Sequence, residues 1–443
     1  MKNILVIGAG RSAVTLIKYL LQNSDSNNWQ VTVADFSEDL AKRAVNDHQN
    51  GRAIFFNVND SDKRENEIMN SDIVISMLPA SLHFTVAKDC VRFKKNLVTA
   101  SYVSQEIAEL DEAAKQAGII LLNEIGLDPG IDHMSAMSVI DEIKDNGGEL
   151  KSFKSFCGGL VHPDYDNNPW NYKFTWNPRN VVLAGQGTAQ YIENGDYKYI
   201  PYNSLFERVE NMEVMDAGVF EGYANRDSLS YRKSYGLDEI PTLFRGTLRR
   251  KGYCEAWNIF VQLGMTDDSY KIEESENITN REFVNMFLPF ENNLSCEEKL
   301  LKKFNLNFDS DIYKKLKWLG IFSEKMIGIA NASPAQILQD ICEQKWTLSK
   351  EDKDMIVMQH QFEYLQKGEL KKLNSSLLVF GDDPVYTSMA KTVGLPVAIA
   401  TKLILNGKIT SLGVKIPTGK DIYIPVLKEL EKYGVNFIEE ELI

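Results

Sequence analysis

A short apolar run, Ile4 to Ile7, ends at the tripeptide Gly8-Ala9-Gly10, and a pattern of helical period follows at once. Apolar side chains then recur about three to four residues apart, the spacing of one helix face, at Val14, Ile17, Leu20 and Leu21. A strand, a glycine turn and a helix in this order are typical of a dinucleotide-binding unit, in which the turn and the helix N-terminus hold a pyrophosphate. The turn alone is a weak signal, because glycine turns also join strands to helices without a ligand.

The alternation of strand-like and helix-like patterns continues to about residue 125. It predicts strands over 30–35, 53–58, 72–77, 97–101 and 119–125. It also predicts helices over 37–49, 81–93 and 104–118, with Ser37 and Ser104 as N-caps and Gly118 as the stop of the last one. We therefore expect an α/β fold with a Rossmann-type, doubly wound parallel sheet, which binds ligands at the carboxyl ends of its strands. In that context the glycine turn becomes a strong signal.

Asp35 ends the second predicted strand, 25 residues after Gly10. A carboxylate at this point accepts hydrogen bonds from the adenosine ribose and repels a 2′-phosphate. No basic residue follows at once, since the next residues are Phe36, Ser37 and Glu38. We therefore expect NAD as the cofactor, with NADP as the alternative. A turn or helix-capping role is the simpler alternative for Asp35.

The character of the sequence changes after about residue 128. Aromatic residues, glycines and short β-like runs over 151–260 predict a mixed sheet, and Lys/Glu-rich helical patterns fill 268–345. Residues 354–365 again have a strand pattern, and 389–405 predict a buried helix interrupted near Pro396. We expect a dinucleotide-binding domain of residues 1–127 completed by 395–443, a mixed α+β substrate domain of residues 128–265 and 346–394, and a helical subdomain of residues 266–345.

Three loops follow predicted strands of the first domain and are expected to face the ligand. The first begins at Ser76 and Met77, the second runs from Ala100 to Ser104, and the third spans 123–134. In the third loop, glycines and a proline surround Asp128, and a helix starts just after it. Such a loop can hold both a cofactor amide and a charged substrate. Turn formation and helix capping are the simpler alternatives for Asp128 and Asp132.

Arginine is unevenly distributed along the chain. Seven of the 13 arginines lie between residues 179 and 250, at 179, 208, 226, 232, 245, 249 and 250. The guanidinium group binds carboxylates in pairs through a fixed fork of donors. The cluster therefore favours recognition of a polycarboxylate, although most surface arginines serve only solvation and ordinary ion pairs.

Composition and charge exclude several other classes of function. The net charge of −13 argues against a general attraction to nucleic acid or anionic membranes, and no apolar run reaches the roughly 20 residues of a membrane span. The five histidines and five cysteines lack metal-binding spacing, so we expect no metal and no disulfide framework. His133 is expected to be structural. Together with a start directly on a strand, scattered cysteines predict a reducing, cytoplasmic location.

With these pieces placed, the chain resembles the L-glutamate-forming saccharopine dehydrogenases, also called saccharopine reductases. The matching motifs run from residue 4 to about 400 and cover nearly the whole chain. They are VIGAGRSA, VISMLPASLH, VTASYVS, LDEAAKQAGI, NEIGLDPGIDHM, FCGGL, NPWNYKFTW, YANRDSL, FRGTLR, KWLGIF and SMAKTVGLP. The resemblance implies that glutamate and 2-aminoadipate 6-semialdehyde join as an imine, which a nicotinamide hydride reduces to saccharopine, and that the reverse reaction splits saccharopine.

The resemblance also implies roles for individual residues. The catalytic candidates are Asp128, Cys157 and Tyr102, with Asp128 and Cys157 flanking the reacting carbon–nitrogen bond. The substrate-binding candidates are Ser101, Tyr102, Asp128, Arg226, Thr247, Leu248 and Arg249. The cofactor-binding candidates are Gly8, Gly10, Arg11, Ser12, Ala13, Asp35, Phe36, Asn57, Val58, Ser76, Met77, Ala100, Ser101, Leu127, Asp128 and Pro129. Saccharopine carries three carboxylates, which fits the arginine-rich stretch.

One departure from the family bears on the cofactor. Fungal members that use NADP carry a basic residue just after the second strand, where this chain has Ala34-Asp35-Phe36. The alternative function is an imine reductase similar to carboxynorspermidine synthase, which needs fewer carboxylate-binding arginines. A non-catalytic redox sensor is a further alternative, and it would not need Asp128, Arg226 and Arg249 together. The family also implies a homodimer.

Overall fold

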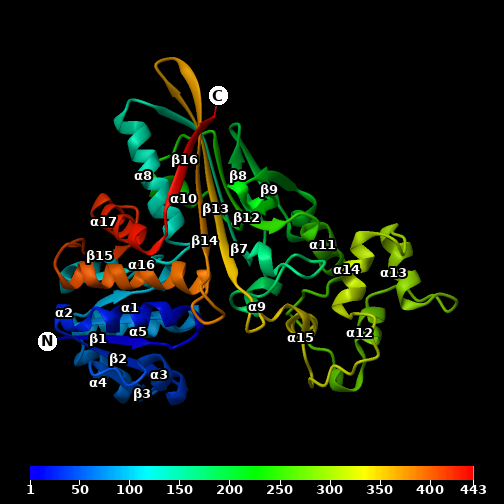
Figure 1. Ribbon diagram of the computed structural model, residues 1–443, viewed down its shortest axis with the longest axis horizontal. Coiled ribbons are helices and arrows are strands. Elements are labelled where there is room, and N and C mark those ends of the chain that lie inside the picture. Colours follow the sequence, from blue (N-terminus) through cyan, green and yellow to red (C-terminus); the bar gives the residue numbers. More distant parts are fainter. Residues whose placement is uncertain (443) are drawn as a thin grey trace.

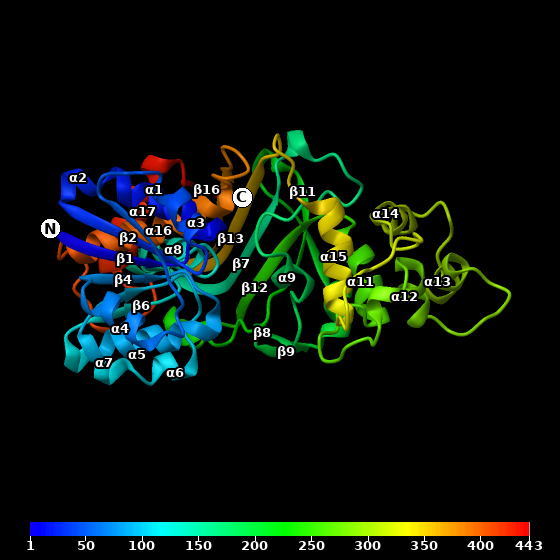
Figure 2. The same ribbon diagram turned by 90° about the horizontal axis from the view of Figure 1, so that it is seen from below.

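A computed structural model describes residues 1–442 and contains two sheets that lie side by side (Figure 1). The first is a seven-stranded parallel sheet and the second is a nine-stranded mixed sheet. Figure 2 shows the parallel sheet at one end of the molecule, the mixed sheet in the middle and a group of helices at the other end. The α/β class with a mixed second sheet is as the sequence predicts.

The parallel sheet has the doubly wound order. In sheet order its strands are β15 (Gly413–Lys415), β6 (Ile120–Leu122), β5 (Asn96–Val98), β4 (Ile73–Ser76), β1 (Lys2–Ile7), β2 (Trp29–Asp35) and β3 (Gly51–Phe55). Successive residues of β1 enter different apolar clusters, with Ile4 and Val6 on one face and Leu5 and Ile7 on the other. Both faces are therefore covered, which explains the continuous apolar runs of these strands.

Helices cover both faces of this sheet and follow the predicted positions closely. They are α1 (Val14–Gln22), α2 (Ser24–Asn27), α3 (Glu38–Val45), α4 (Ser61–Met69), α5 (His83–Phe93), α6 (Gln105–Ala108) and α7 (Asp111–Ala117). Ser37 and Ser104 cap α3 and α6, and Gly118 ends α7 in the left-handed conformation, as predicted. The single helix predicted over 104–118 divides into α6 and α7, and α2 and α4 are additional helices that their polar sequences concealed.

The mixed sheet carries the second half of the chain. Its main path is β10 (Val209–Glu213), β11 (Val219–Ala224), β12 (Thr242–Arg250), β7 (Glu149–Val161), β13 (Asp354–Gln366), β14 (Glu369–Phe380) and β16 (Phe437–Leu442). The hairpin of β8 (Ala189–Glu193) and β9 (Asp196–Ile200) joins it at β12. Strands β12 and β7 run parallel, whereas the other neighbouring pairs are antiparallel.

Further helices connect and cover the two sheets. These are α8 (Ile131–Asp145), α9 (Pro178–Val182), α10 (Tyr231–Ser234), α11 (Tyr253–Leu263), α16 (Ser388–Leu405) and α17 (Lys420–Leu430). The group at the far end consists of α12 (Asn280–Met286), α13 (Cys296–Phe304), α14 (Asp311–Leu319) and α15 (Pro334–Trp346). Helix α8 leads from β6 directly into β7, so the loop before it lies between the two sheets.

Helix α16 packs against α1 on the parallel sheet (Figure 1). By length and composition it could cross a membrane, with a mean hydropathy of 1.3, but 78% of its apolar window is buried inside the protein. It therefore serves as a core helix of this fold. It also runs unbroken through Pro396, contrary to the predicted interruption, because packing on both sides of the proline outweighs one missing hydrogen bond.

The C-terminal segment divides between the two sheets. The sequence predicts that residues 395–443 complete the dinucleotide-binding domain, and β15 does pair with β6 in the parallel sheet. Strand β16 differs, because it pairs with β14 at the edge of the mixed sheet. Its alternating pattern is too short and too acidic to indicate from sequence which sheet it joins.

Candidate active site

The glycine turn after β1 has the geometry of a pyrophosphate site. Gly8 has a φ of +106°, and a Cβ on it would lie 2.8 Å from the carbonyl oxygen of Met77, so only glycine fits there. A Cβ on Gly10 would meet no atom within 4 Å, which leaves the space in front of the turn open. No side chain within residues 1–442 caps the helical turn that Arg11 and Ser12 begin, and Ala13 behind them is buried. The turn therefore fits a nicotinamide dinucleotide.

Asp35 fixes this turn to the end of β2. Its Oδ2 accepts a hydrogen bond of 2.7 Å from the backbone N–H of Ala9, and its Oδ1 accepts one of 2.8 Å from that of Ser37. The carboxylate thus lies beside the glycine turn, where the adenosine ribose is expected. Each of its oxygens keeps a second lone pair for a ribose hydroxyl.

The predicted adenosine edge lies beyond Asp35. Phe36 is 71% exposed and its ring lies 5.5 Å from that of Phe55 at the end of β3. The next loop carries Asn57 and Val58, and the Val58 carbonyl accepts a 2.5 Å hydrogen bond from Nη1 of Arg64. Arg64 is itself held by a buried ion pair, so this edge is rigid at Val58 and open at Phe36.

The loop between β6 and α8 folds into a tight turn around Asp128. The Gly126 N–H donates to the carbonyl of Pro129 over 2.9 Å, and the Ile131 N–H donates to the carbonyl of Gly126 over the same distance. A Cβ on Gly130 would lie 2.1 Å from the carbonyl oxygen of Gly126, so the turn requires that glycine. Leu127 is buried in the turn, whereas the Asp128 side chain remains 18% exposed.

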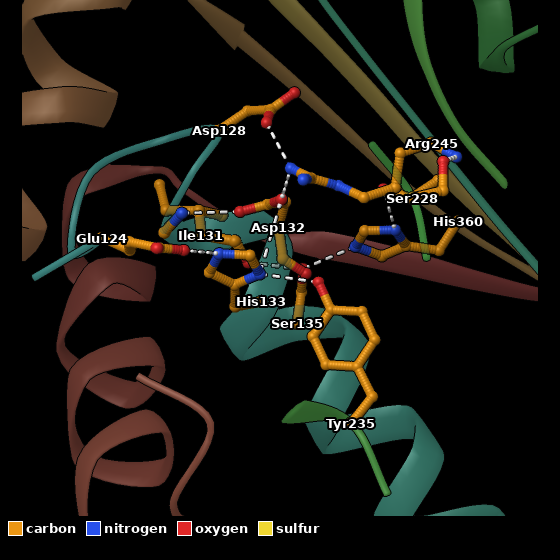
Figure 3. Close-up of polar contacts among 12 residues, drawn as sticks. Glu124, Asp128, Ile131, Asp132, His133, Ser135, Ser228, Tyr235, Arg245 and His360 are labelled. Atoms are coloured by element: carbon orange, nitrogen blue, oxygen red, sulfur yellow. Dashed lines mark hydrogen bonds and ion pairs between the residues drawn. The ribbon is translucent and has the colours of Figure 1, made fainter. Parts of the chain in front are cut away.

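Arg245 of β12 binds two carboxylates, that of Asp128 in this loop and that of Asp132 at the start of α8 (Figure 3). Its Nη2 lies 2.6 Å from Oδ1 of Asp128 and 2.7 Å from Oδ2 of Asp132. The guanidinium also stacks 4.1 Å from the ring centre of Tyr231. The loop of the parallel sheet and the central strand of the mixed sheet are thereby joined by a buried ionic contact.

The two carboxylates have opposite electrostatic settings. The pKa of Asp128 is raised to about 6, mainly by burial and also by the charge of Asp132, while Arg245 opposes the rise. Burial also disfavours the charge on Asp132, but His133, Arg245 and the Gly130 N–H together hold its pKa below the usual value. Two carboxylates with separated pKa values leave Asp128 as the one that can exchange a proton near neutral pH.

His133 is fixed on both sides, as the structural role predicts. Its Nε2 lies 2.9 Å from a carboxylate oxygen of Glu124, and its Nδ1 lies 2.6 Å from the hydroxyl of Tyr235 (Figure 3). Glu124 also accepts a hydrogen bond from the N–H of Val103, directly after Tyr102. This network fixes the Asp128 loop and the Tyr102 loop relative to each other. Tyr102 itself is 43% exposed and is not part of the apolar core.

Arg249 lies on the same strand as Arg245, four residues further on. It is only 3% exposed, and its guanidinium faces the rings of Tyr172, Tyr223 and Tyr253 at 5.2, 5.8 and 5.4 Å. Its one hydrogen bond goes to the carbonyl of Leu248, and no carboxylate of residues 1–442 pairs with it. Its Nε and the hydroxyl of Tyr172 have no hydrogen-bond partner among the residues that the structure describes. A buried cation in this state calls for an anionic ligand.

The strand register brings other predicted residues to the same place. Thr247 of β12 pairs with Cys157 of β7, and alternation along β12 puts Thr247 on the face of Arg245 and Arg249. Burial, followed by Asp128 and Asp132, raises the pKa of the Cys157 thiol well above its usual value. The thiol therefore stays protonated. Leu248 differs, because its side chain lies in the apolar cluster of the opposite face, so only its backbone can serve the site.

Arg226 lies at the Arg245 end of the strand. It follows Asn225, whose N–H donates to the carbonyl of Arg245 over 2.8 Å, and its side chain is exposed. Within residues 1–442 no ion pair engages it. Arg245 and Arg249 are separated by four residues of strand, about 13 Å, so the arginines span the length of an extended substrate.

Sequence reasoning missed two residues of the site. Arg245 was visible only as one of seven clustered arginines, although its position two residues before Thr247 places it on the same strand face. His83 is the other. It is buried between Ser76 and Ser101, two predicted site residues at the ends of β4 and β5. Within residues 1–442 no group of histidine, cysteine and acidic side chains is arranged to hold a metal.

Comparisons with known proteins agree with this geometry. Residues 4–122 match the sequence model of the saccharopine dehydrogenase NADP binding domain, and residues 126–435 match that of the saccharopine dehydrogenase C-terminal domain. The saccharopine dehydrogenase [NADP(+), L-glutamate-forming] of Schizosaccharomyces pombe is 36% identical over 454 residues, which cover 100% of this chain and 99% of the relative. The crystal structure of apo saccharopine dehydrogenase (L-Glu forming) from Saccharomyces cerevisiae superposes with a TM-score of 0.90 at 34% identity, covering 100% of both chains.

A further relative is longer than this chain. The mitochondrial alpha-aminoadipic semialdehyde synthase of Rattus norvegicus is 34% identical over 448 residues, which cover 100% of this chain and 48% of the rat protein. This chain therefore corresponds to about half of that protein.

Proposed function

The chain belongs to the saccharopine dehydrogenase family, and from this premise we propose how its site interconverts saccharopine with L-glutamate and 2-aminoadipate 6-semialdehyde. It is an oxidoreductase that acts on a CH–NH group with a nicotinamide cofactor. The observation that carries the assignment of the substrate site is the buried Arg249, which has no carboxylate partner in residues 1–442. The relatives do not favour the alternative, an imine reductase similar to carboxynorspermidine synthase.

Carboxylate recognition sets the position of the substrate. Arg249 offers a desolvated guanidinium at one end of β12, and Tyr172 and Thr247 lie beside it with hydroxyl groups. Arg226 offers a second, exposed guanidinium at the other end. Arg245 is already neutralised by Asp128 and Asp132. We therefore assign the outer carboxylates of saccharopine to Arg249 and Arg226 and the central carbon–nitrogen bond to the region of Asp128 and Cys157.

Asp128 provides the proton chemistry. The nicotinamide, when bound, accepts or supplies the hydride. In the oxidative direction the secondary amine of saccharopine must first lose its extra proton, and a carboxylate with a pKa of about 6 can accept it. Once Asp128 has passed this proton to solvent, its carboxylate is ionised again and stabilises the positive charge of the iminium that forms, and Arg245 keeps the carboxylate in place. The neutral Cys157 thiol and Tyr102 shape the pocket beside the reacting bond.

We propose NAD as the preferred cofactor. The relative from S. pombe is named for NADP(+). In this chain, however, Asp35 holds its carboxylate beside the glycine turn, and the next basic side chain on α3, Lys42, is already paired with Glu38 at 2.8 Å. A 2′-phosphate would meet a negative charge there. A homodimer and a cytoplasmic location stay predictions from the sequence.

The test is an absorbance assay at 340 nm with purified protein, saccharopine, and NAD or NADP in parallel. Reduction of NAD with little reduction of NADP is the expected result. Reduction of NADP alone would keep the enzyme and refute the role given to Asp35. The absence of turnover with either cofactor, together with NADH oxidation in the presence of aspartate semialdehyde and a diamine, would move the chain to the alternative function.

A further inference from the structure

His83 connects two loops of the active site. It is the first residue of α5, and its ring lies between the ends of β4 and β5. Its Nδ1 is 2.8 Å from the hydroxyl of Ser76, and its Nε2 is 2.7 Å from the hydroxyl of Ser101. The His83 side chain is 2% exposed and Ser76 is fully buried. Neither His83 nor Ser76 takes part in the proton transfer assigned to Asp128.

The direction of both hydrogen bonds follows from the acceptors that are available to the Ser76 hydroxyl. Within residues 1–442 its hydroxyl has no partner other than His83, so its hydrogen has one acceptor, Nδ1. Burial lowers the pKa of His83 to about 4, so the ring is neutral and carries its hydrogen on Nε2. Nε2 then donates to Ser101. The opposite tautomer would leave the buried Ser76 hydroxyl without an acceptor, which costs about 1–3 kcal/mol.

The Ser101 hydroxyl still has its own hydrogen available as a hydrogen-bond donor. Its oxygen accepts from His83, and its own hydrogen has no acceptor among the described residues. The residue is partly buried, and its carbonyl is held by the N–H of Glu124 at 3.0 Å. It directly precedes Tyr102 on the substrate side of the sheet. A hydroxyl fixed in this way suits an anionic or carbonyl acceptor on a ligand.

We propose that His83 is a positioning residue that holds the Ser101 hydroxyl as a hydrogen-bond donor to a carboxylate of the substrate. This inference rests on the proposed function, since it assumes a carboxylate substrate. The neutral imidazole accepts a hydrogen bond from Ser76 at Nδ1 and donates one to Ser101 at Nε2. The Ser101 hydroxyl is therefore left to donate its own hydrogen to the substrate. A lysine or arginine at this place would instead compete with Ser101 for the substrate.

The test compares two amides that imitate opposite ends of the imidazole. In His83→Gln the amide reaches the Nε2 position and can still donate to Ser101. In His83→Asn the amide reaches only the Nδ1 position and leaves Ser101 free to rotate. We expect His83→Gln to keep the KM for saccharopine within about two-fold. We expect His83→Asn to raise the KM for saccharopine about ten-fold, the equivalent of one hydrogen bond.

A double substitution separates positioning from packing. Ser101→Ala should raise the KM for saccharopine as His83→Asn does, and the double variant should lose no more than either single one. Additive losses, or equal losses in His83→Gln and His83→Asn, would overturn the inference. If His83→Asn does not fold, Ser76→Ala takes its place, because it removes the hydrogen bond that selects the tautomer of His83. Ser76→Ala should raise the KM for saccharopine when Ser101 is present and should have no further effect in a Ser101→Ala background. Failure of the unmodified protein to oxidise saccharopine would refute the proposed function instead.

Discussion

Nη2 of Arg245 lies 2.6 Å from Oδ1 of Asp128, and this contact joins the two halves of the active site. Asp128 comes from the parallel sheet side and Arg245 from the centre of the mixed sheet. The same nitrogen also binds Asp132, so one guanidinium compensates two buried carboxylates. Arg245 therefore helps to set the relative position of cofactor and substrate, together with the His133–Tyr235 contact and the apolar cluster that the two sheets share.

Replacement of Arg245 is expected to destabilise the protein strongly. Arg245→Met leaves Asp128 and Asp132 buried without a cation, and removal of one member of a buried ion pair costs about 3–5 kcal/mol. Urea unfolding followed by circular dichroism measures the change. Arg226→Met is the matched control, because that arginine is exposed and should change the free energy of unfolding by less than about 0.5 kcal/mol. Equal effects of the two variants would contradict the assigned role of Arg245.

The rate of saccharopine oxidation is expected to fall at acidic pH. The pKa of Asp128, about 6, lies above its ordinary value, so the carboxylate is protonated below about pH 6 and can no longer accept a proton from the substrate amine. A plot of kcat/KM against pH should therefore fall on its acidic side, with a midpoint near pH 6. The pKa of His83 and that of His360 are both lowered by burial to about 4, so these residues cannot cause it.

Asp128→Asn tests that assignment. It should lower kcat/KM at neutral pH by about 100-fold, the lower range for loss of a positioned proton acceptor, and remove the acidic limb. The raised pKa of Asp128 also makes the stability of the fold depend on pH. Because the pKa in the folded state is above that of the unfolded state, the Asp128 contribution to stability is full below about pH 4 and is lost as the pH rises through 6. An acidic limb that persists in the variant would assign it to another group.

Arg249 and Arg226 should differ in how they affect substrate binding. Arg249→Met removes a desolvated carboxylate partner, so the KM for saccharopine should rise by more than about 100-fold. Arg226→Ala removes an exposed partner and should raise the same KM by about five-fold. Tight binding of NADH, followed by its fluorescence, should be unchanged in both. A loss of NADH binding in step with the loss of saccharopine binding would point to misfolding.

Asp35→Ala should narrow the preference for NAD. The substitution removes the acceptor for the ribose hydroxyls and the charge that opposes a 2′-phosphate. The ratio of kcat/KM for NAD to that for NADP should therefore fall by about ten-fold. Asp39→Ala, an exposed carboxylate in the first turn of α3, is the control for general charge. An unchanged ratio in Asp35→Ala would refute the cofactor argument.

The parallel sheet could be predicted from the sequence because its determinants are local. The apolar runs, the glycine turn and the caps Ser37, Ser104 and Gly118 each act within a few residues. The arrangement of the site residues was harder to predict from the sequence. The link from Arg245 to Asp128 spans 117 residues of sequence, and the link from His360 to Ser135 spans 225. Such pairs depend on the register between β12, β7 and β13, which no local pattern of this chain contains.

The last prediction concerns Gly394, where α16 crosses α1 behind the glycine turn. A Cβ on Gly394 would lie 2.9 Å from the backbone nitrogen of Leu16 and 3.1 Å from the carbonyl oxygen of Ser12. Gly394→Val should therefore push α1 away from α16, lower the free energy of unfolding by about 1–3 kcal/mol and weaken NADH binding, since Ser12 begins the turn that faces the pyrophosphate. Gly394→Ala should show a smaller loss, because the better helix propensity of alanine offsets about 1 kcal/mol of the clash. Ala398→Gly, one turn further on, is the control for destabilisation of α16 without a clash, since it lowers helix propensity and removes a buried methyl group, and it should leave NADH affinity unchanged. If Gly394→Val binds NADH as tightly as the unmodified chain, the close approach of α16 has no part in shaping the cofactor site.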